Sequence, residues 1–170
     1  MLILENAITS KNARETKEWL LKKIPFRSNY GSHLLNDRLL VIYKFAKSEL
    51  IAFLILKNPK NVCFWEVTYV WVDKEFRSKK VAEKLYSIAI NQNLILSSGK
   101  SQTKFARAFW RKLISKSKFT IFAFDLKSEV AEDAVVIDDE IYTPLPHLYV
   151  EDERLAKKHD VRLIAIKVEK

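Results

Sequence analysis

The feature that most constrains the fold is a strand-like run that leads through a short charged loop directly into an amphipathic helix. Residues 62–72 (VCFWEVTYVWV) are rich in β-branched and aromatic side chains. Apolar residues occur at both odd and even positions, so both faces of a strand here would be apolar. This pattern predicts a central strand covered on both faces. Residues 73–79 are mostly charged, and residues 80–91 repeat apolar side chains at helical spacing. They predict a tight loop followed by a helix.

Further strands and helices are predicted from the rest of the chain. They are helices at 11–24 (with Ser10 as N-cap) and 102–115, a loop at 26–33, a β-hairpin from 38–45 and 50–56, strands at 94–97, 119–124 and 161–168, an acidic stretch at 127–140, and at most a short polar helix at 151–159. The strand–helix–strand crossover over 62–96 predicts one parallel pair in an otherwise antiparallel sheet. The predicted fold class is therefore α/β (α+β), a mixed central sheet flanked by helices.

The composition limits the kinds of site that the chain can form. Cys63 is the single cysteine, which excludes an internal disulfide and a cysteine-only metal cage. The three histidines lack metal-ligand spacing, so no metal site is predicted. The N-terminus shows no signal-peptide pattern, and no run approaches the roughly 18 apolar residues that span a bilayer. We therefore expect a cytoplasmic protein with no membrane partner.

The formal net charge of the chain is +9. Such a charge favours an acidic partner, which could be nucleic acid, a phosphate-bearing cofactor or an acidic protein surface. The alternative is a lysine-rich surface that only faces solvent. Charge alone leaves both interpretations open.

The start of the helix at 80–91 is a candidate anion site. The first backbone N–H groups of a helix have no intrahelical partner, and the helix dipole favours negative charge there. Arg77, Lys79 and Lys80 place positive charge beside these groups. The segment therefore predicts a site that a pyrophosphate group could occupy.

The same segment resembles motif A of the GNAT acetyltransferase superfamily, a strand ending in Val-x-Pro-x-x-Arg followed by Arg/Gln-x-x-Gly-x-Gly/Ala. The residues that match this pattern are Val72, Phe76, Arg77, Ala82 and Leu85. The resemblance implies that the backbone of Val70, Trp71 and Val72 pairs with the pantetheine arm of acetyl-CoA. It also implies that N–H groups from Arg77 to Ala82 cradle the pyrophosphate, so that Arg77, Ser78, Lys79, Lys80, Val81 and Ala82 are expected cofactor-binding residues.

A second segment, residues 96–113, is similar to motif B of the same superfamily. Its Ser…Gln-Thr…Phe-Trp-x-Lys-Leu pattern resembles GNAT-like proteins encoded by bacteriophages. The resemblance adds Ser97 and Trp110 to the expected cofactor-binding residues. It covers about residues 10–125, so we expect a single GNAT-like domain over 1–170 with a C-terminal extension at 126–170. A phage origin would place the protein in the host cytoplasm.

Three positions depart from the family pattern. Lys80 stands where glycine is expected, and Asp73-Lys74 replaces the expected proline. Glycine lets a phosphate approach the backbone closely, so the lysine side chain must swing away or become a phosphate ligand itself. Trp110 aligns with a tyrosine that often protonates the leaving thiolate, and an indole cannot supply that proton.

Glu66 is the candidate general base. It lies six residues before Val72, which predicts the same face of the strand. The resemblance implies a base near this position, commonly acting through water, because an acceptor ammonium must lose a proton before it can attack. The alternative is a carboxylate at the rim of the strand, paired with a lysine.

Two functions from different classes remain open. The first is an acetyl-CoA-dependent N-acetyltransferase that transfers directly to the amine of an unknown acceptor, with a host protein as one candidate. The second is a GNAT-fold protein that has lost catalysis and docks on nucleic acid or on a protein partner, which would explain Lys80, Trp110 and the net charge. A GNAT-fold enzyme that modifies a DNA base is a third alternative, although the sequence contains no dedicated motif for it.

Overall fold

A computed structural model of the chain describes residues 13–25, 29–99, 104–115, 119–138, 140–145 and 160–167. The chain divides into two compact units, Met1–Gln92 and Asn93–Lys170. Among the described residues, no helix is both long and apolar enough to cross a bilayer. The predicted N-cap Ser10 and the polar helix at 151–159 lie outside the described residues. The single domain with a core at 10–125 stays a prediction.

The first unit contains an antiparallel sheet in the order β1-β2-β3-β4. Its elements are α1 (Ala13–Lys23), β1 (Tyr30–Asn36), β2 (Leu39–Ala46), β3 (Glu49–Lys57), β4 (Trp65–Val72), the 3₁₀ helix η2 (Lys74–Lys79) and α2 (Val81–Asn91). The predicted hairpin is confirmed as β2 and β3. Lys47 and Ser48 form its turn, and both have positive φ angles of 48° and 66°, as a two-residue hairpin turn requires.

Strand β1 corrects the predicted loop at 26–33. The chain is already extended at Tyr30, and Gly31 pairs with Tyr43 of β2. The Tyr43 ring covers this glycine so closely that a Cβ atom on Gly31 would lie 2.5 Å from the Tyr43 hydroxyl oxygen. The glycine therefore serves close packing inside a strand, whereas the sequence pattern had indicated a loop.

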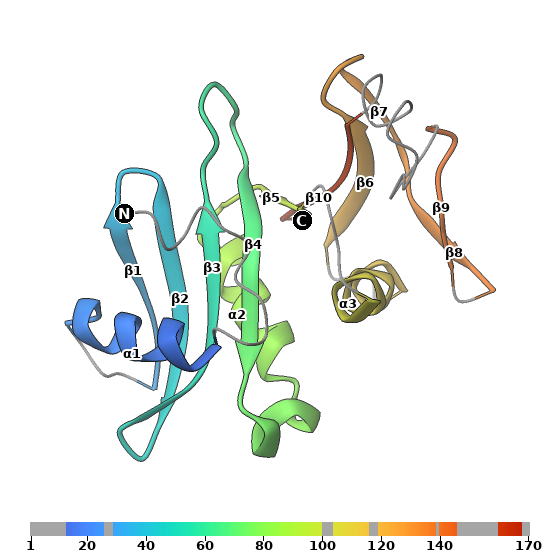
Figure 1. Ribbon diagram of the computed structural model, residues 1–170. Helices are drawn as coiled ribbons and strands as arrows, with labels where there is room; N and C mark the ends of the chain where they lie inside the picture. The colour runs from blue at the N-terminus through green and yellow to red at the C-terminus, as the bar shows by residue number, and fades with distance from the viewer. Residues whose placement is uncertain are drawn as a thin grey trace. The chain divides into compact units, whose positions relative to one another are not determined.

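Apolar side chains on both faces of this sheet are buried. Leu20 and Ile24 at the end of α1 pack with alternate residues of β2 and β3, among them Val41 and Phe53. The residues between these point to the other face because side chains alternate along a strand, and Leu54 is one of them. Figure 1 shows α1 on one face of the strands and α2 on the other, and α2 contacts β2, β3 and β4.

The second unit also pairs its strands antiparallel, in the order β5-β10-β6-β7, with a separate hairpin of β8 and β9. Its elements are β5 (Leu96–Ser97), α3 (Lys104–Ser115), β6 (Thr120–Asp125), β7 (Val130–Asp133), β8 (Val135–Ile137), β9 (Glu140–Tyr142) and β10 (Val161–Ile166). The predicted strands at 119–124 and 161–168 are confirmed with small shifts at their ends. No strand was predicted in the acidic stretch at 127–140, but it contains short, largely exposed strands.

The predicted α/β class is confirmed: the strands form mostly antiparallel sheet and helices flank it. The long strand predicted at 62–72 is β4, which begins three residues later, at Trp65. Its side chains are half-buried for most of its length, so it is less enclosed than predicted. The parallel pairing expected from the 62–96 crossover stays a prediction.

Candidate functional site

The end of β4 is hydrogen-bonded to β3, and the chain continues directly into η2. The N–H of Asp73 donates to the carbonyl oxygen of Ile51 on β3 at 2.8 Å. The Asp73 side chain then accepts a hydrogen bond from the N–H of Glu75 at 3.1 Å and caps the 3₁₀ helix. The charged segment predicted as a loop is therefore a capped 3₁₀ helix, with a fixed start.

Arg77 folds back from η2 onto the end of β4. Its Nε atom donates a hydrogen bond to the carbonyl oxygen of Val72 at 3.2 Å, and the side chain is exposed. A planar guanidinium keeps further N–H donors on its terminal nitrogens. Arg77 can therefore hold the last turn of the strand and still present positive charge to a ligand.

Lys80 joins η2 to α2 in a left-handed conformation, with φ 54° and ψ 23°. Its side chain makes no capping hydrogen bond to the first turn of α2. The carbonyl oxygen of Lys80 accepts a hydrogen bond from the N–H of Lys84 at 3.1 Å, which is the first hydrogen bond of α2. A left-handed residue at this position explains why a family pattern would place glycine here, since glycine adopts positive φ without steric cost. The lysine side chain does not cap the start of the helix.

A β-bulge in β4 changes which face of the sheet Glu66 occupies. Ile55 of β3 pairs with Tyr69, but the next β3 residue, Leu56, pairs with Val67, so Thr68 is an extra residue on β4. Its hydroxyl donates to the carbonyl oxygen of Ile55 at 3.1 Å. Because side chains opposite each other share a face, the extra residue reverses the alternation between the two ends of the strand.

The prediction that Glu66 and Val72 share a face of the strand is therefore wrong. Glu66 lies opposite Lys57, on the α1 side of the sheet, whereas Val72 lies opposite Ala52, on the α2 side. The sequence count of six residues assumed an unbroken alternation, and the bulge at Thr68 breaks it. Glu66 is half-buried, and the lysine opposite agrees with the rim-carboxylate alternative.

The aromatic side chains of β4 belong to the packing of the first unit. Tyr69 and Trp71 pack against the core cluster under α1, and the Trp71 ring stacks on Phe53 with centroids 5.4 Å apart. Lys17 of α1 lies over the Trp71 ring, with its Nζ 5.6 Å from the ring centroid. Partial burial raises the pKa of the Tyr69 phenol above its ordinary value. Trp71 therefore leaves only its backbone for a cofactor, as the resemblance implied.

A pocket of about 530 Å³ lies between the β2–β3 turn and the η2–α2 junction. It includes two of the predicted site residues, Lys79 and Val81, and brings Lys44 and Lys47 beside them. The sequence prediction missed these two lysines because they lie more than twenty residues before the motif. The signal that could have found them is topological: in an antiparallel meander, the β2–β3 turn lies at the same end of the sheet as the end of β4.

The predicted residues of the second unit are buried. Trp110 is 1% exposed on α3, and Ser97 is inaccessible at the end of β5, where its hydroxyl donates to the carbonyl oxygen of Ser98 at 2.9 Å. Inside its own unit, neither side chain presents a polar group to solvent. Their expected contacts with a cofactor stay predictions.

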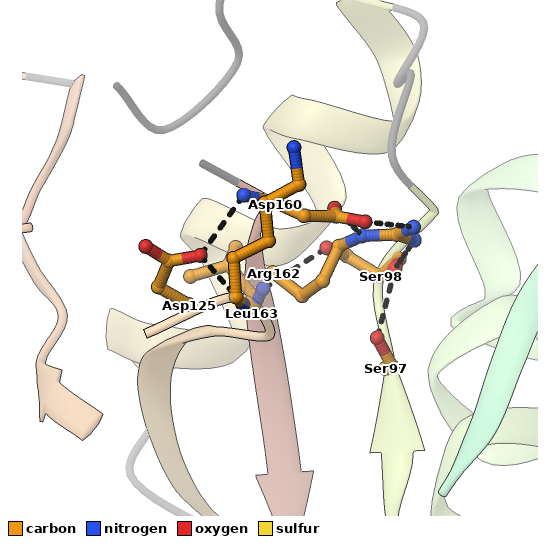
Figure 2. A network of polar contacts seen from close by, with 7 residues as sticks. Ser97, Ser98, Asp125, Asp160, Arg162 and Leu163 are labelled. Carbon is orange, nitrogen blue, oxygen red and sulfur yellow. Dashed lines mark hydrogen bonds and ion pairs between the residues drawn. The ribbon is translucent and has the colours of Figure 1, made fainter. Parts of the chain in front are cut away.

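A buried ionic network in the second unit was not foreseen from the sequence (Figure 2). Arg162 of β10 is 6% exposed; its guanidinium makes two hydrogen bonds to Asp160, through Nε and Nη2, and Nη1 donates to the carbonyl oxygen of Ser98 at 3.0 Å. Asp125, 1% exposed, accepts hydrogen bonds from the N–H groups of Asp160 and Lys127 and from the hydroxyl of Ser128. The hydrogen bonds among these groups connect β5, β6 and β10, and the charged groups use their donors and acceptors within the fold.

Among the residues that the structure describes, no three His, Cys, Asp or Glu side chains gather in a way that could hold a metal ion. The chain matches no protein-family model. It also matches no curated protein sequence.

Three solved acetyltransferase-type structures are similar to the chain at a low level. An IAA acetyltransferase from Bacillus cereus is 14% identical, with a TM-score of 0.44 over 98% of this chain and 93% of that one. Escherichia coli ElaA is 13% identical, with a TM-score of 0.44 over 98% and 92%. A GNAT family acetyltransferase from Elizabethkingia anophelis with acetyl-CoA bound is 11% identical, with a TM-score of 0.42 over 99% and 92%.

Proposed function

We propose that the chain is an acetyl-CoA-dependent N-acetyltransferase of the GNAT superfamily. The observation that carries this proposal is the conformation of Lys80. At the position where the motif requires glycine, the backbone has φ 54° and joins a capped 3₁₀ helix to the start of α2. Glycine is the residue that adopts this left-handed backbone without steric cost, so the conformation of Lys80 fits the glycine of the motif.

The residues at this junction fit a diphosphate. The N–H groups of Val81 and Ala82 belong to the first turn of α2, which the Lys80 side chain does not cap. Arg77, Ser78 and Lys79 are exposed beside it and can add hydrogen bonds and positive charge. The backbone of Val70, Trp71 and Val72 would hold the pantetheine arm, as the motif resemblance implies.

Acetyl-CoA, when bound, supplies the acetyl thioester. The role of the chain is then to orient the thioester carbonyl with backbone N–H groups of β4 and to accept a proton from the acceptor ammonium. The bulge at Thr68 supports the first role because a bulge leaves backbone groups of the longer strand outside the regular ladder. Glu66 is the proposed base, and it would serve an acceptor that enters from the α1 side of the sheet.

The acceptor class follows from charge only in part. A net charge of +9 suits an amine on an acidic protein or on another acidic surface. If the chain is encoded by a phage, as its motif B pattern suggests, a host protein is the acceptor that we propose.

The proposal is tested by the binding of acetyl-CoA to the folded protein. Acetyl-CoA in large excess over its dissociation constant should raise the melting temperature, because a ligand that binds only the folded state stabilises it. Arg77→Glu should abolish the rise, whereas Lys60→Glu, a matched charge reversal at an exposed turn, should preserve it. A wild-type protein that shows neither a thermal shift nor calorimetric heat with acetyl-CoA would defeat the proposal.

Catalysis is tested separately through Glu66. Glu66→Gln should slow the release of free CoA in the presence of an amine acceptor by about tenfold or more, with unchanged affinity for acetyl-CoA. The same rate in both proteins would remove Glu66 from the mechanism and would leave it as the carboxylate opposite Lys57.

The second candidate is a GNAT-fold binding protein without catalysis, and the burial of Trp110 favours it. A side chain that is 1% exposed and has no acidic proton cannot serve as the acid that the aligned family tyrosine supplies. This candidate predicts affinity for a short DNA or RNA duplex that falls steeply with salt concentration. No affinity at low salt would remove the nucleic-acid form of this candidate.

A further inference from the structure

We propose that the pocket between the β2–β3 turn and η2 binds a small molecule with two or more phosphate groups, at a site that adjoins the proposed acyl-CoA site and shares Lys79 and Val81 with it. The proposal goes beyond the acetyltransferase function and does not depend on it. Most of the pocket lies outside the motif segment at 70–82: its lining includes Lys44, Lys47 and Ser48. Of the residues expected to cradle the pyrophosphate, only Lys79 and Val81 line the pocket.

The charge of the pocket selects for an anion. Lys44 comes from β2, Lys47 from the β2–β3 turn and Lys79 from η2, so three separate elements each place a lysine at one cavity. None of the described residues that line it is acidic. Three lysines around one cavity make it positively charged, and a polyanionic ligand is attracted to such a cavity.

Two of the lysines are held in place by aromatic rings in the pocket wall. The Nζ of Lys44 lies 4.1 Å from the ring centroid of Tyr30, and the Nζ of Lys79 lies 4.6 Å from that of Phe76. Both rings line the pocket. An ammonium over a ring face keeps N–H donors for another partner, and its restricted side chain loses less entropy when a ligand binds. The site is therefore partly organised before binding.

The size and walls of the pocket indicate more than a single phosphate ion. Its volume of about 530 Å³ lies within the range of roughly 300–1,000 Å³ that is typical of small-molecule sites. Polar side chains of Asn29 and Ser48 add hydrogen-bonding groups at the rim. The turn that carries Lys47 and Ser48 is fixed by the flanking pair of Ala46 with Glu49. A chain of linked phosphates would reach several of these groups at once.

The experiment is isothermal titration of the full chain at about 0.15 M salt, where the screening length is about 8 Å, with two probes: inorganic tripolyphosphate and acetyl-CoA. The double variant Lys44→Gln/Lys47→Gln should weaken tripolyphosphate binding by about tenfold or more, because it removes two charged hydrogen-bond donors. Acetyl-CoA affinity should change by less than about twofold, because neither lysine belongs to the proposed acyl-CoA site. In a ¹⁵N-labelled protein, tripolyphosphate should shift the amide resonances of Ala46, Ser48 and Val81 first.

The matched control is Lys22→Gln/Lys60→Gln, which removes the same charge from two exposed positions outside the pocket. It should leave tripolyphosphate affinity within about twofold, since exposed charges that do not line the pocket are screened by solvent and salt. Equal losses in both double variants, or no tripolyphosphate binding by the wild-type protein, would overturn the proposal. So would an acetyl-CoA affinity that falls with Lys44 and Lys47 as strongly as the tripolyphosphate affinity does.

The two proposals can fail independently. Arg77→Glu should remove acetyl-CoA binding and keep tripolyphosphate binding within a few-fold, because Arg77 does not line the pocket. A wild-type protein that binds tripolyphosphate through Lys44 and Lys47 but never binds acetyl-CoA would defeat the acetyltransferase proposal alone.

Discussion

Charged groups gather at two places in the chain, around the η2–α2 junction of the first unit and around Asp125 and Arg162 in the second. At the junction, Arg77, Lys79 and Lys80 are exposed, and Lys80 does not cap the helix that follows it. In the second unit, Arg162 and Asp125 are buried and hydrogen-bonded to backbone and side-chain groups around them. Charge at the junction is available to a ligand, whereas charge in the network is used by the fold.

This contrast separates two ways in which polar residues are kept in a structure. A buried charge is tolerated only where partners replace its hydration, so its removal should cost folding free energy. An exposed charge with few protein partners costs little to keep or to remove, and its value lies in what it can bind. The two places should therefore respond to mutation in opposite ways, in stability at one and in ligand affinity at the other.

The largest effect is expected at Asp125. Asp125→Ala leaves the N–H groups of Asp160 and Lys127 and the hydroxyl of Ser128 without their acceptor in a buried site, which should lower the free energy of unfolding by about 3 kcal/mol. Urea denaturation followed by far-UV circular dichroism measures this loss. Lys79→Ala at the junction should change the same quantity by less than about 0.5 kcal/mol.

Asp125→Asn serves as the conservative control. Its amide oxygen can take the place of Oδ1, which accepts both backbone hydrogen bonds, from Lys127 and Asp160. It should lose clearly less stability than Asp125→Ala. If the two variants and Lys79→Ala all unfolded at the wild-type urea concentration, the network would not be structural and the contrast between the two places would disappear.

Local patterns were enough to predict the elements whose own residues determine them. The β2–β3 hairpin and α2 were predicted because alternation, turn residues and helical spacing are all contained in short windows. β1 was missed because Gly31 indicates a loop until the Tyr43 ring that covers it is known. The strands β7 to β9 were missed because each is only three or four residues long, which is too short to show alternation, and they lie in or beside an acidic stretch.

The candidate site was predictable only where it is contiguous in sequence. The motif at 70–82 could be read directly, and the structure adds the left-handed backbone of Lys80 that no residue preference would have indicated. The face of Glu66 was wrong because a single extra residue, Thr68, reverses the alternation. The basic pocket and the Asp125 network depend on residues distant in sequence, so they required the fold.

An intermediate effect is expected at Tyr86. It tests whether solvent is excluded from the buried face of α2, although the start of this helix is exposed. Burial raises the pKa of the Tyr86 phenol well above its ordinary value of about 10. Its stabilising contribution is fully present below pH 10. Above this pH it is lost, because the unfolded chain ionises while the folded protein does not. Between pH 10 and 11 one such group should lower the free energy of unfolding by about 1 kcal/mol.

Tyr86→Phe should remove this part of the alkaline loss, measured as the difference in unfolding free energy between pH 10 and 11. Tyr69→Phe is the matched comparison. Its phenol is only partly buried, and burial raises its pKa too, so it should remove a smaller part. The same pH dependence in wild type and Tyr86→Phe would show that solvent reaches the core side of α2, and the open region would then extend along the whole helix.

The smallest effect is expected at the backbone of Lys80. Lys80→Gly should raise the free energy of unfolding by about 0.5–1 kcal/mol, because glycine adopts a φ of 54° without the steric cost that a side chain imposes. Lys80→Ala removes the same charge and keeps the cost, so it should show no gain. Thermal denaturation at several salt concentrations separates this backbone effect from a charge effect, which salt would screen.

Glu129 gives the counterpart in the second unit, where it adopts a φ of 58° in the turn that Asp125 holds. Glu129→Gly should give a similar gain in stability, because the steric reason is the same at both places. The two variants should then differ in ligand binding: Lys80→Gly should change acetyl-CoA affinity, since it alters the surface that the diphosphate would touch, and Glu129→Gly should not. Equal affinities in both variants and in wild type would mean that the left-handed residue at the η2–α2 junction, like the one at Glu129, serves only the turn of the chain.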